Sequence, residues 1–197
     1  MKKLFIKPML MQLFVAALVL CNFNAHAQKT TIWIVRHAEK ADTPANNPAL
    51  TTIGQQRAKE LLKSFKHDKI AAIYTTNYLR TAQTAQPTAS QFAVTQQTYN
   101  PADLKAFAAK VLQDNAGKNV LIVGHSNTVV PTLAALGCTT PFNTLTDDDY
   151  DILFKVTVKN GKASLEMSYY GTPHHSTQLP EQAIHELNPV PHPVGNF

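Results

Sequence analysis

Hydrophobic and polar residues alternate in two kinds of segment after about residue 30. Short apolar runs rich in β-branched residues indicate buried strands, and longer runs with apolar and small residues at helical spacing indicate helices. The predicted strands cover residues 30–35, 69–74 and 120–123, with a short fourth strand within 93–99. The predicted helices cover residues 52–65, 77–92, 101–111 and 127–136. Strands and helices therefore alternate along this part of the chain.

Two proline-containing positions indicate where predicted helices begin or end. Asn100 is a favoured N-cap residue and Pro101 suits the first helical position, so we expect a helix to begin there. Pro87 lies inside the segment 77–92 and predicts a kink or an early end of that helix.

The pattern changes near Thr146. Segments 151–158 and 163–170 flank Asn160 and Gly161, which both tolerate a positive φ and predict a β-hairpin. Residues 171–197 are rich in proline and histidine and show little periodicity, so we expect an irregular segment on the surface.

These elements predict a three-layer α/β fold. A mostly parallel sheet would carry helices on both faces, and the C-terminal hairpin would add antiparallel strands at one edge. The length of 197 residues suits one domain, and 44% hydrophobic with 16% charged residues fits a folded globular protein. In such folds ligands bind beyond the carboxyl ends of the strands.

The first 27 residues resemble a secretory signal peptide. Three early lysines precede an apolar stretch at 9–23, and Ala25 and Ala27 supply the small side chains of a cleavage site. The stretch is shorter than the ~20 residues that span a bilayer, and Gln12 interrupts it, so a membrane anchor is the weaker interpretation. We expect a signal peptide at 1–27, a domain at 28–170 and the irregular segment at 171–197. The protein would then be periplasmic or secreted, with no membrane anchor after cleavage.

Charge and cysteine content exclude several classes of partner. Removing three lysines and no acidic residue with the signal lowers the formal net charge from +5 to +2. No basic run remains, so nucleic acid is not an expected partner. Cys138 would be the only cysteine left, which excludes an intramolecular disulfide and a metal site built on thiolates. The histidines of the last segment have no regular ligand spacing, so we expect no metal and no cofactor; they are His174, His175, His185 and His192.

Candidate chemistry lies at the ends of two predicted strands. Arg36 and His37 follow the first strand, His125 follows the third after Gly124, and Arg80 lies in the first turns of the helix after the second strand. Positive and hydrogen-bonding groups gathered at one sheet edge suit a dianion, because an arginine fork can bind two phosphoryl oxygens. The cluster predicts a phosphate pocket.

These motifs resemble the histidine phosphatase superfamily, also called phosphoglycerate mutase-like. The resemblance rests on Arg36-His37-Ala38, Leu79-Arg80-Thr81, Gly124-His125-Ser126 and the segment 50–58 at the start of the first helix. It implies a phosphatase in which His37 attacks phosphorus and forms a phosphohistidine, while Arg36, Arg80 and His125 hold the equatorial oxygens. His37 must then be neutral at the attacking nitrogen, and we expect a hydrogen bond to its other nitrogen to fix the tautomer.

The general acid is the main departure from the family pattern. Many members carry an acidic residue that protonates the leaving oxygen, and the nearest candidate here is Asp103, with Glu39 and Asp42 as weaker ones. Asp103 lies in the first turn of a predicted helix, where a carboxylate is stabilised and donates a proton poorly. Ala38, where the family usually has glycine, is small enough to let the backbone approach phosphate.

The alternatives left open are a phosphate-binding envelope protein with little turnover and a phosphoglycerate mutase-like phosphotransferase. Export argues against the mutase, whose substrates are cytoplasmic. The expected partners are a phosphorylated small molecule or a phosphoprotein.

Overall fold

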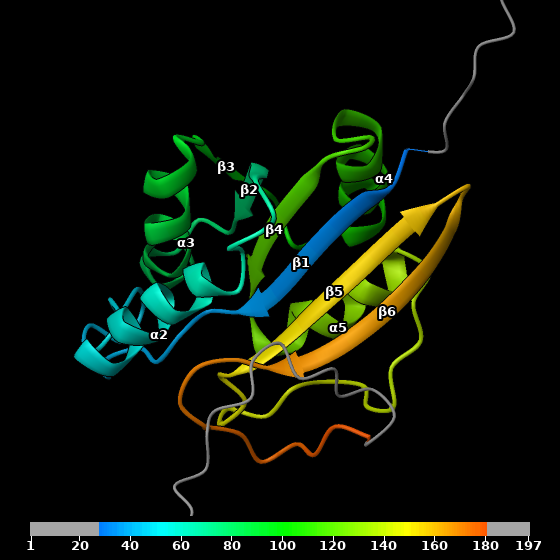
Figure 1. Ribbon diagram of the computed structural model, residues 1–197. Coiled ribbons are helices and arrows are strands. Elements are labelled where there is room, and N and C mark those ends of the chain that lie inside the picture. Colours follow the sequence, from blue (N-terminus) through cyan, green and yellow to red (C-terminus); the bar gives the residue numbers. More distant parts are fainter. Residues whose placement is uncertain (1–27, 181–197) are drawn as a thin grey trace, which may run out of the picture.

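The computed structural model describes residues 28–180 (Figure 1). A six-stranded sheet runs through it in the order β3-β2-β4-β1-β5-β6. The strands are β1 (Thr30–Arg36), β2 (Ile70–Thr75), β3 (Gln96–Thr98), β4 (Asn119–Gly124), β5 (Ile152–Lys159) and β6 (Lys162–Tyr169). The signal peptide predicted at 1–27 and the end of the C-terminal segment, 181–197, lie outside the described residues.

The sheet has a parallel half and an antiparallel edge. β3, β2, β4 and β1 are parallel neighbours, whereas β5 runs antiparallel to β1 and β6 antiparallel to β5. Asn160 and Gly161 connect β5 to β6 with φ values of 53° and 71°, the positive φ that their sequence predicted. The predicted α/β fold with a C-terminal hairpin is therefore confirmed.

Helices cover both faces of the sheet. They are α2 (Thr52–Lys63), α3 (Leu79–Phe92), α4 (Leu104–Asp114) and α5 (Ser126–Ala135). α2 packs against α3, and α4 packs against α5 (Figure 1). Side chains of β1 point alternately into the two layers: Trp33 packs beside Phe65 on the first side, and Ile34 joins the core with Leu133 on the second.

The start of α4 differs from the sequence prediction. Asp103, and not Asn100, is the N-cap, because its Oδ1 accepts a hydrogen bond of 3.0 Å from the backbone N–H of Ala106. The side chain of Asn100 instead accepts a 3.0 Å bond from the N–H of Ala102, which closes a local turn before the helix begins. The prediction was wrong because both residues are good caps and only the turn geometry decides between them.

Helix α3 continues through Pro87 to Phe92, so the predicted early end is wrong. Fully buried side chains on both sides of the proline, among them Ala85 and Thr88, hold the helix against the sheet. Packing on either side thus outweighs the hydrogen bond that proline cannot make.

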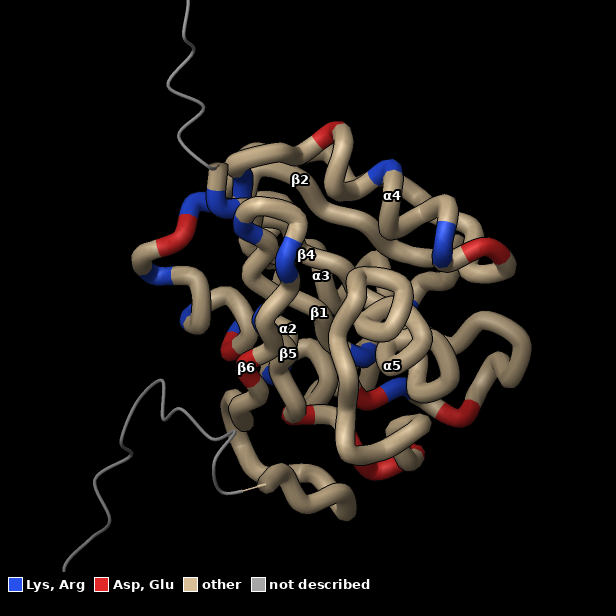
Figure 2. Tube along the Cα trace, turned by 90° about the vertical axis from the view of Figure 1, so that its right-hand side faces the viewer, with Lys and Arg blue, Asp and Glu red and all other residues tan. Residues whose placement is uncertain are grey.

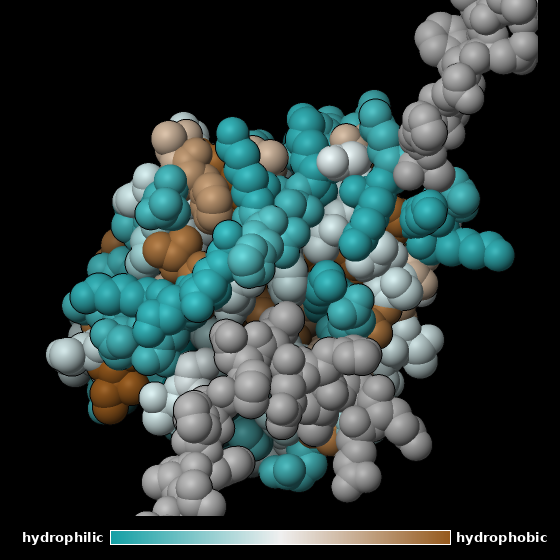
Figure 3. All heavy atoms as spheres, in the orientation of Figure 1, coloured by the Kyte–Doolittle hydropathy of each residue, from teal (hydrophilic) through white to brown (hydrophobic). Residues whose placement is uncertain are grey.

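The surface of the described residues is mixed. Figure 2 shows Lys and Arg beside Asp and Glu around the trace, without a single basic stripe along it. Hydrophobic residues form separate patches on the face seen in Figure 3, and the exposed large ones are Ile53, Tyr78 and Leu79. Within 28–180, no helix is long and apolar enough to cross a membrane.

Candidate active site

Two histidines stand side by side because their strands are neighbours. β1 and β4 pair in parallel with Arg36 opposite Gly124, so the residues that follow, His37 and His125, leave the sheet together. The backbone N–H of His37 donates to the carbonyl of Gly124 at 2.9 Å. The two rings are 5.3 Å apart between centroids and inclined at 66°. The predicted convergence at the carboxyl ends of the strands is present.

His37 is buried and held in one tautomer. Its Nδ1 lies 2.9 Å from the carbonyl oxygen of Ala38, which only accepts hydrogen bonds, so Nδ1 carries the proton and Nε2 does not. Burial lowers the pKa of His37 to about 3, with the Ala38 hydrogen bond opposing it and the charge of Arg36 adding to it. The ring is therefore neutral near pH 7, with a free lone pair on Nε2.

His125 is neutral for related reasons. A guanidinium nitrogen of Arg80 lies 3.4 Å from its Nδ1, and because arginine only donates, Nδ1 accepts. Nε2 then carries the proton and donates to the hydroxyl of Thr76 at 2.8 Å. Burial lowers the pKa of His125 to about 4, and the charges of Arg80 and Arg36 contribute.

The two arginines each lie over a tyrosine ring. The guanidinium carbon of Arg36 is 4.2 Å from the ring centroid of Tyr150, and that of Arg80 is 4.3 Å from the ring centroid of Tyr78. The Nε atoms of both arginines are buried and have no hydrogen-bond partner among the described residues. A buried donor without a partner is unfavourable, so both arginines are suited to binding an anion.

Sequence reasoning missed three residues that shape this site. Tyr150 lies 6.2 Å from His37 between ring centroids, Thr76 holds His125, and the hydroxyl of Thr84 accepts a 2.9 Å bond from the N–H of Ala38. Thr76 directly follows β2, so the rule about strand ends would have found it. Tyr150 precedes an antiparallel strand, to which that rule does not apply.

Comparison with known proteins agrees with this geometry. The family model of the histidine phosphatase superfamily (branch 1) matches residues 32–101, which include Arg36, His37 and Arg80. In this part of its length the chain is similar to the histidine phosphatase superfamily. A comparison of the sequence with curated proteins gives no match.

Several solved structures share the fold of this chain. A proposed alpha-ribazole-5'-P phosphatase of Escherichia coli is 12% identical, with 76% of this chain and 99% of that one covered and a TM-score of 0.59. The protein histidine phosphatase SixA, complexed with tungstate, is 20% identical, with coverage of 69% and 94% and a TM-score of 0.55. A proposed phosphohistidine phosphatase SixA of Nakamurella multipartitia is 18% identical, with coverage of 75% and 98% and a TM-score of 0.53. At these identities the likeness establishes the fold.

Within 28–180, none of the three carboxylates considered as general acids makes a hydrogen bond or ion pair with His37 or His125. Asp103 is exposed and caps α4, and Asp42 is exposed in the loop after β1. Glu39 is buried, and although burial raises its pKa, hydrogen bonds from Arg57 and His174 lower it further, to below its ordinary value. Glu39 is thus held as a carboxylate.

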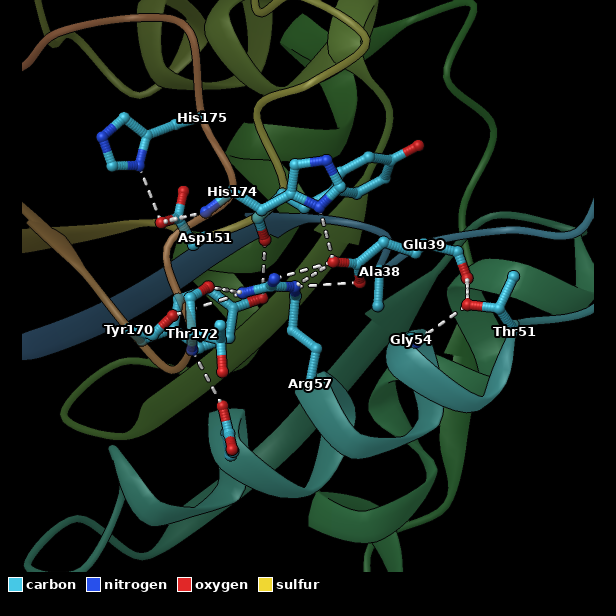
Figure 4. Close-up of polar contacts among 12 residues, drawn as sticks. Ala38, Glu39, Thr51, Gly54, Arg57, Asp151, Tyr170, Thr172, His174 and His175 are labelled. Carbon is cyan, nitrogen blue, oxygen red and sulfur yellow. Dashed lines mark hydrogen bonds and ion pairs between the residues drawn. The ribbon is translucent and has the colours of Figure 1, made fainter.

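Glu39 belongs to a network that joins the C-terminal segment to the site (Figure 4). Arg57 reaches from α2 and donates to both carboxylate oxygens at 2.7–2.9 Å, while Nδ1 of His174 donates to Oε1 at 2.9 Å. The ring of His174 lies 4.9 Å from that of Tyr150 between centroids. The described part of the C-terminal segment, 171–180, is irregular as predicted. It also lies against the site, because His174 contacts Glu39 and Tyr150.

The histidines of that segment pair with carboxylates in the described part. His174 contacts Glu39, and Nδ1 of His175 lies 2.8 Å from Asp151. The described residues hold no group of three His, Cys, Asp or Glu side chains that could bind a metal ion. His185 and His192 lie outside the described residues.

Proposed function

We propose that the protein is a metal-independent phosphatase that hydrolyses phosphomonoesters or phosphorylated side chains through a phosphohistidine on His37. One observation carries the proposal: the unprotonated Nε2 of a buried, neutral histidine lies beside two arginines whose Nε–H donors have no partner within residues 28–180. A nucleophile surrounded by fixed positive charge is what transfer of a phosphoryl group requires. The match of residues 32–101 to the model of the histidine phosphatase superfamily supports the same proposal.

The reaction takes two displacements at phosphorus. The Nε2 lone pair of His37 attacks in line, the N–P bond forms, and the ester P–O bond breaks, with its electron pair leaving on the departing oxygen. Water then attacks the phosphohistidine, the P–N bond breaks, and inorganic phosphate leaves as Nε2 regains its lone pair. Arg36 and Arg80 stabilise charge on the equatorial oxygens in both steps, and His125 joins them when its Nε2–H turns from Thr76 to a phosphoryl oxygen. The Nδ1–H bond to Ala38 stabilises the positive ring of the intermediate.

The surroundings of the acidic residues favour substrates whose leaving groups need little protonation. Asp103 is committed to a helix cap and Glu39 to Arg57, so neither is placed to donate a proton to the departing oxygen. Aryl phosphates and phosphohistidine should therefore react faster than alkyl phosphates such as glycerol phosphate. SixA, one of the structures with this fold, is named a protein histidine phosphatase, which agrees with this preference.

We also propose that the protein acts in the periplasm or outside the cell, on the strength of the signal-like residues 1–27. The intact mass of the exported protein should correspond to a chain that begins at Gln28. An exported protein that retains Met1 would show that residues 1–27 are not a cleaved signal peptide.

The function is tested by phosphate release from p-nitrophenyl phosphate and glycerol phosphate in the presence of EDTA. We expect turnover of the aryl ester with no loss in EDTA, slow turnover of the alkyl ester, and little change for Asp103→Asn. A large loss confined to the alkyl ester in Asp103→Asn would assign Asp103 as the acid. If the wild type releases no phenolate, the phosphate-binding alternative replaces the proposed function.

A further inference from the structure

Arg36 is held by the loop that precedes β5. Its guanidinium donates to the carbonyl oxygen of Thr146 at 2.7 Å and to Oδ1 of Asp147 at 3.0 Å, and more weakly to the Tyr150 hydroxyl at 3.5 Å. The side chain of Arg36 is 3% exposed, whereas that of Asp147 is 93% exposed. A surface carboxylate thus reaches a buried arginine of the candidate site.

The Asp147 carboxylate and a phosphoryl group would compete for the same N–H donors of Arg36. Both are anions that accept hydrogen bonds from a guanidinium fork, and an N–H group occupied by Asp147 is not free for a phosphoryl oxygen. If both anions remain bound, their like charges repel across a short distance. Binding of a phosphoryl dianion is therefore weakened by the presence of Asp147.

The Asp147 side chain can rotate away from Arg36 without disturbing the rest of the structure. Its side chain makes no other hydrogen bond among the described residues, so its rotation into solvent breaks one contact only. The backbone of the loop is fixed separately: buried Asp149 accepts bonds from the N–H of Thr146 at 2.7 Å and from the N–H of Thr177 at 2.8 Å. The movable part is thus a single side chain on a fixed loop.

Arg36 does not need Asp147 for its orientation. The Thr146 carbonyl and the face of the Tyr150 ring already fix the guanidinium from two directions. Removal of the Asp147 charge should therefore leave Arg36 in place and weaken the hydrogen bond that competes for its N–H donor.

We propose that Asp147 is an internal competing anion, which pairs with Arg36 in the free enzyme and is displaced by the phosphoryl group. Its effect is to lower the affinity of the site for phosphate, so that the product of hydrolysis leaves more readily. This inference rests on the proposed function, because it requires that the site around Arg36 binds a phosphoryl group.

The neighbouring acid supplies a matched control. Asp148 is exposed in the same loop, and its carboxylate makes no hydrogen bond or ion pair with Arg36 or any other described residue. Asp147→Asn and Asp148→Asn therefore change the net charge equally and differ in the contact with Arg36. Asparagine keeps the shape of the aspartate side chain in both variants.

The test is titration calorimetry of inorganic phosphate against the purified wild type and the two variants. The ion pair is weakened by solvent because its carboxylate is exposed, so we expect Asp147→Asn to bind phosphate about two- to fivefold more tightly, with Asp148→Asn close to the wild type. The difference between the variants should shrink in high salt, which screens exposed charges.

Equal or weaker phosphate binding by Asp147→Asn, in a wild type that binds phosphate, would overturn the inference and leave the proposed function standing. An equal gain for both variants would show a general charge effect and would also overturn it. If neither the wild type nor Asp147→Asn binds phosphate, the proposed function itself fails, and this inference fails with it.

Discussion

At the scale of single residues, burial determines the chemistry of His37. An exposed imidazole would be partly protonated near neutral pH, but burial holds the pKa of His37 at about 3 and that of His125 at about 4. Both rings remain neutral as the pH falls until that range is reached. The unfolded chain binds these protons at a pH near ~6.5, so acidification below that value destabilises the folded state.

We predict that the ring signals of His37 and His125 do not titrate between pH 5 and pH 8 in NMR spectra of the substrate-free protein. The ring signal that is missing from the spectrum of His37→Ala belongs to His37, and His125→Ala identifies the signal of His125 in the same way. A midpoint near ~6.5 for either ring would show that burial does not keep that ring neutral.

The residues of the site divide into those that the sequence predicts and those that it does not. Arg36, His37 and His125 directly end or follow buried strands, and their positions follow from the rule for parallel sheets. Tyr150 and Asp147 come from a loop whose path depends on the buried carboxylate of Asp149, and no periodicity encodes that path. The sequence therefore predicts the catalytic candidates better than their surroundings.

At the scale of elements, the contact between α2 and the chain after β1 joins the site to the scaffold. Gly54 lies at this contact, where a Cβ would overlap with the carbonyl oxygen of Glu39. The close approach lets Arg57, on the next turn of α2, reach the buried carboxylate of Glu39. Helical spacing predicts α2, but the sequence does not reveal this pairing, because Glu39 and Arg57 come together only when the helix packs.

We predict that Arg57→Met lowers the free energy of unfolding by about 3 kcal/mol, because it leaves the carboxylate of Glu39 buried without its partner. Urea denaturation at pH 7 measures the change. Lys110→Met removes the exposed ion pair with Asp114 and serves as the control, with no measurable effect expected. An equal response of both variants would contradict a special role for the buried pair.

The buried pair of Glu39 and Arg57 makes the free energy of unfolding depend on pH. The pKa of Glu39 is lowered in the folded state, so its contribution is present above its ordinary value of 4.5 and is lost as the pH falls through the lower folded value. The decrease in the free energy of unfolding caused by Arg57→Met should therefore be smaller in acid than at pH 7.

At the scale of the whole molecule, the order of the strands assembles the site. β1 lies between β4 and β5, so one side of His37 faces the His125 strand end and the other faces the loop that carries Tyr150. The described part of the C-terminal segment closes this second side, with His174 and Thr177 bound to buried carboxylates. Alternating strands and helices predict the layers, whereas the path of the last segment depends on polar contacts that have no sequence period.

The central claim is that His37 carries the phosphoryl group, and isolation of the covalent intermediate tests it most directly. The enzyme would be mixed with an aryl phosphate, quenched in alkali, which preserves phosphohistidine, and digested for mass spectrometry. We expect one phosphoryl group on His37, attached at Nε2 because Nδ1 is occupied by its bond to Ala38, and none in His37→Ala. A phosphoryl group on another residue, or full turnover by His37→Ala, would contradict the account.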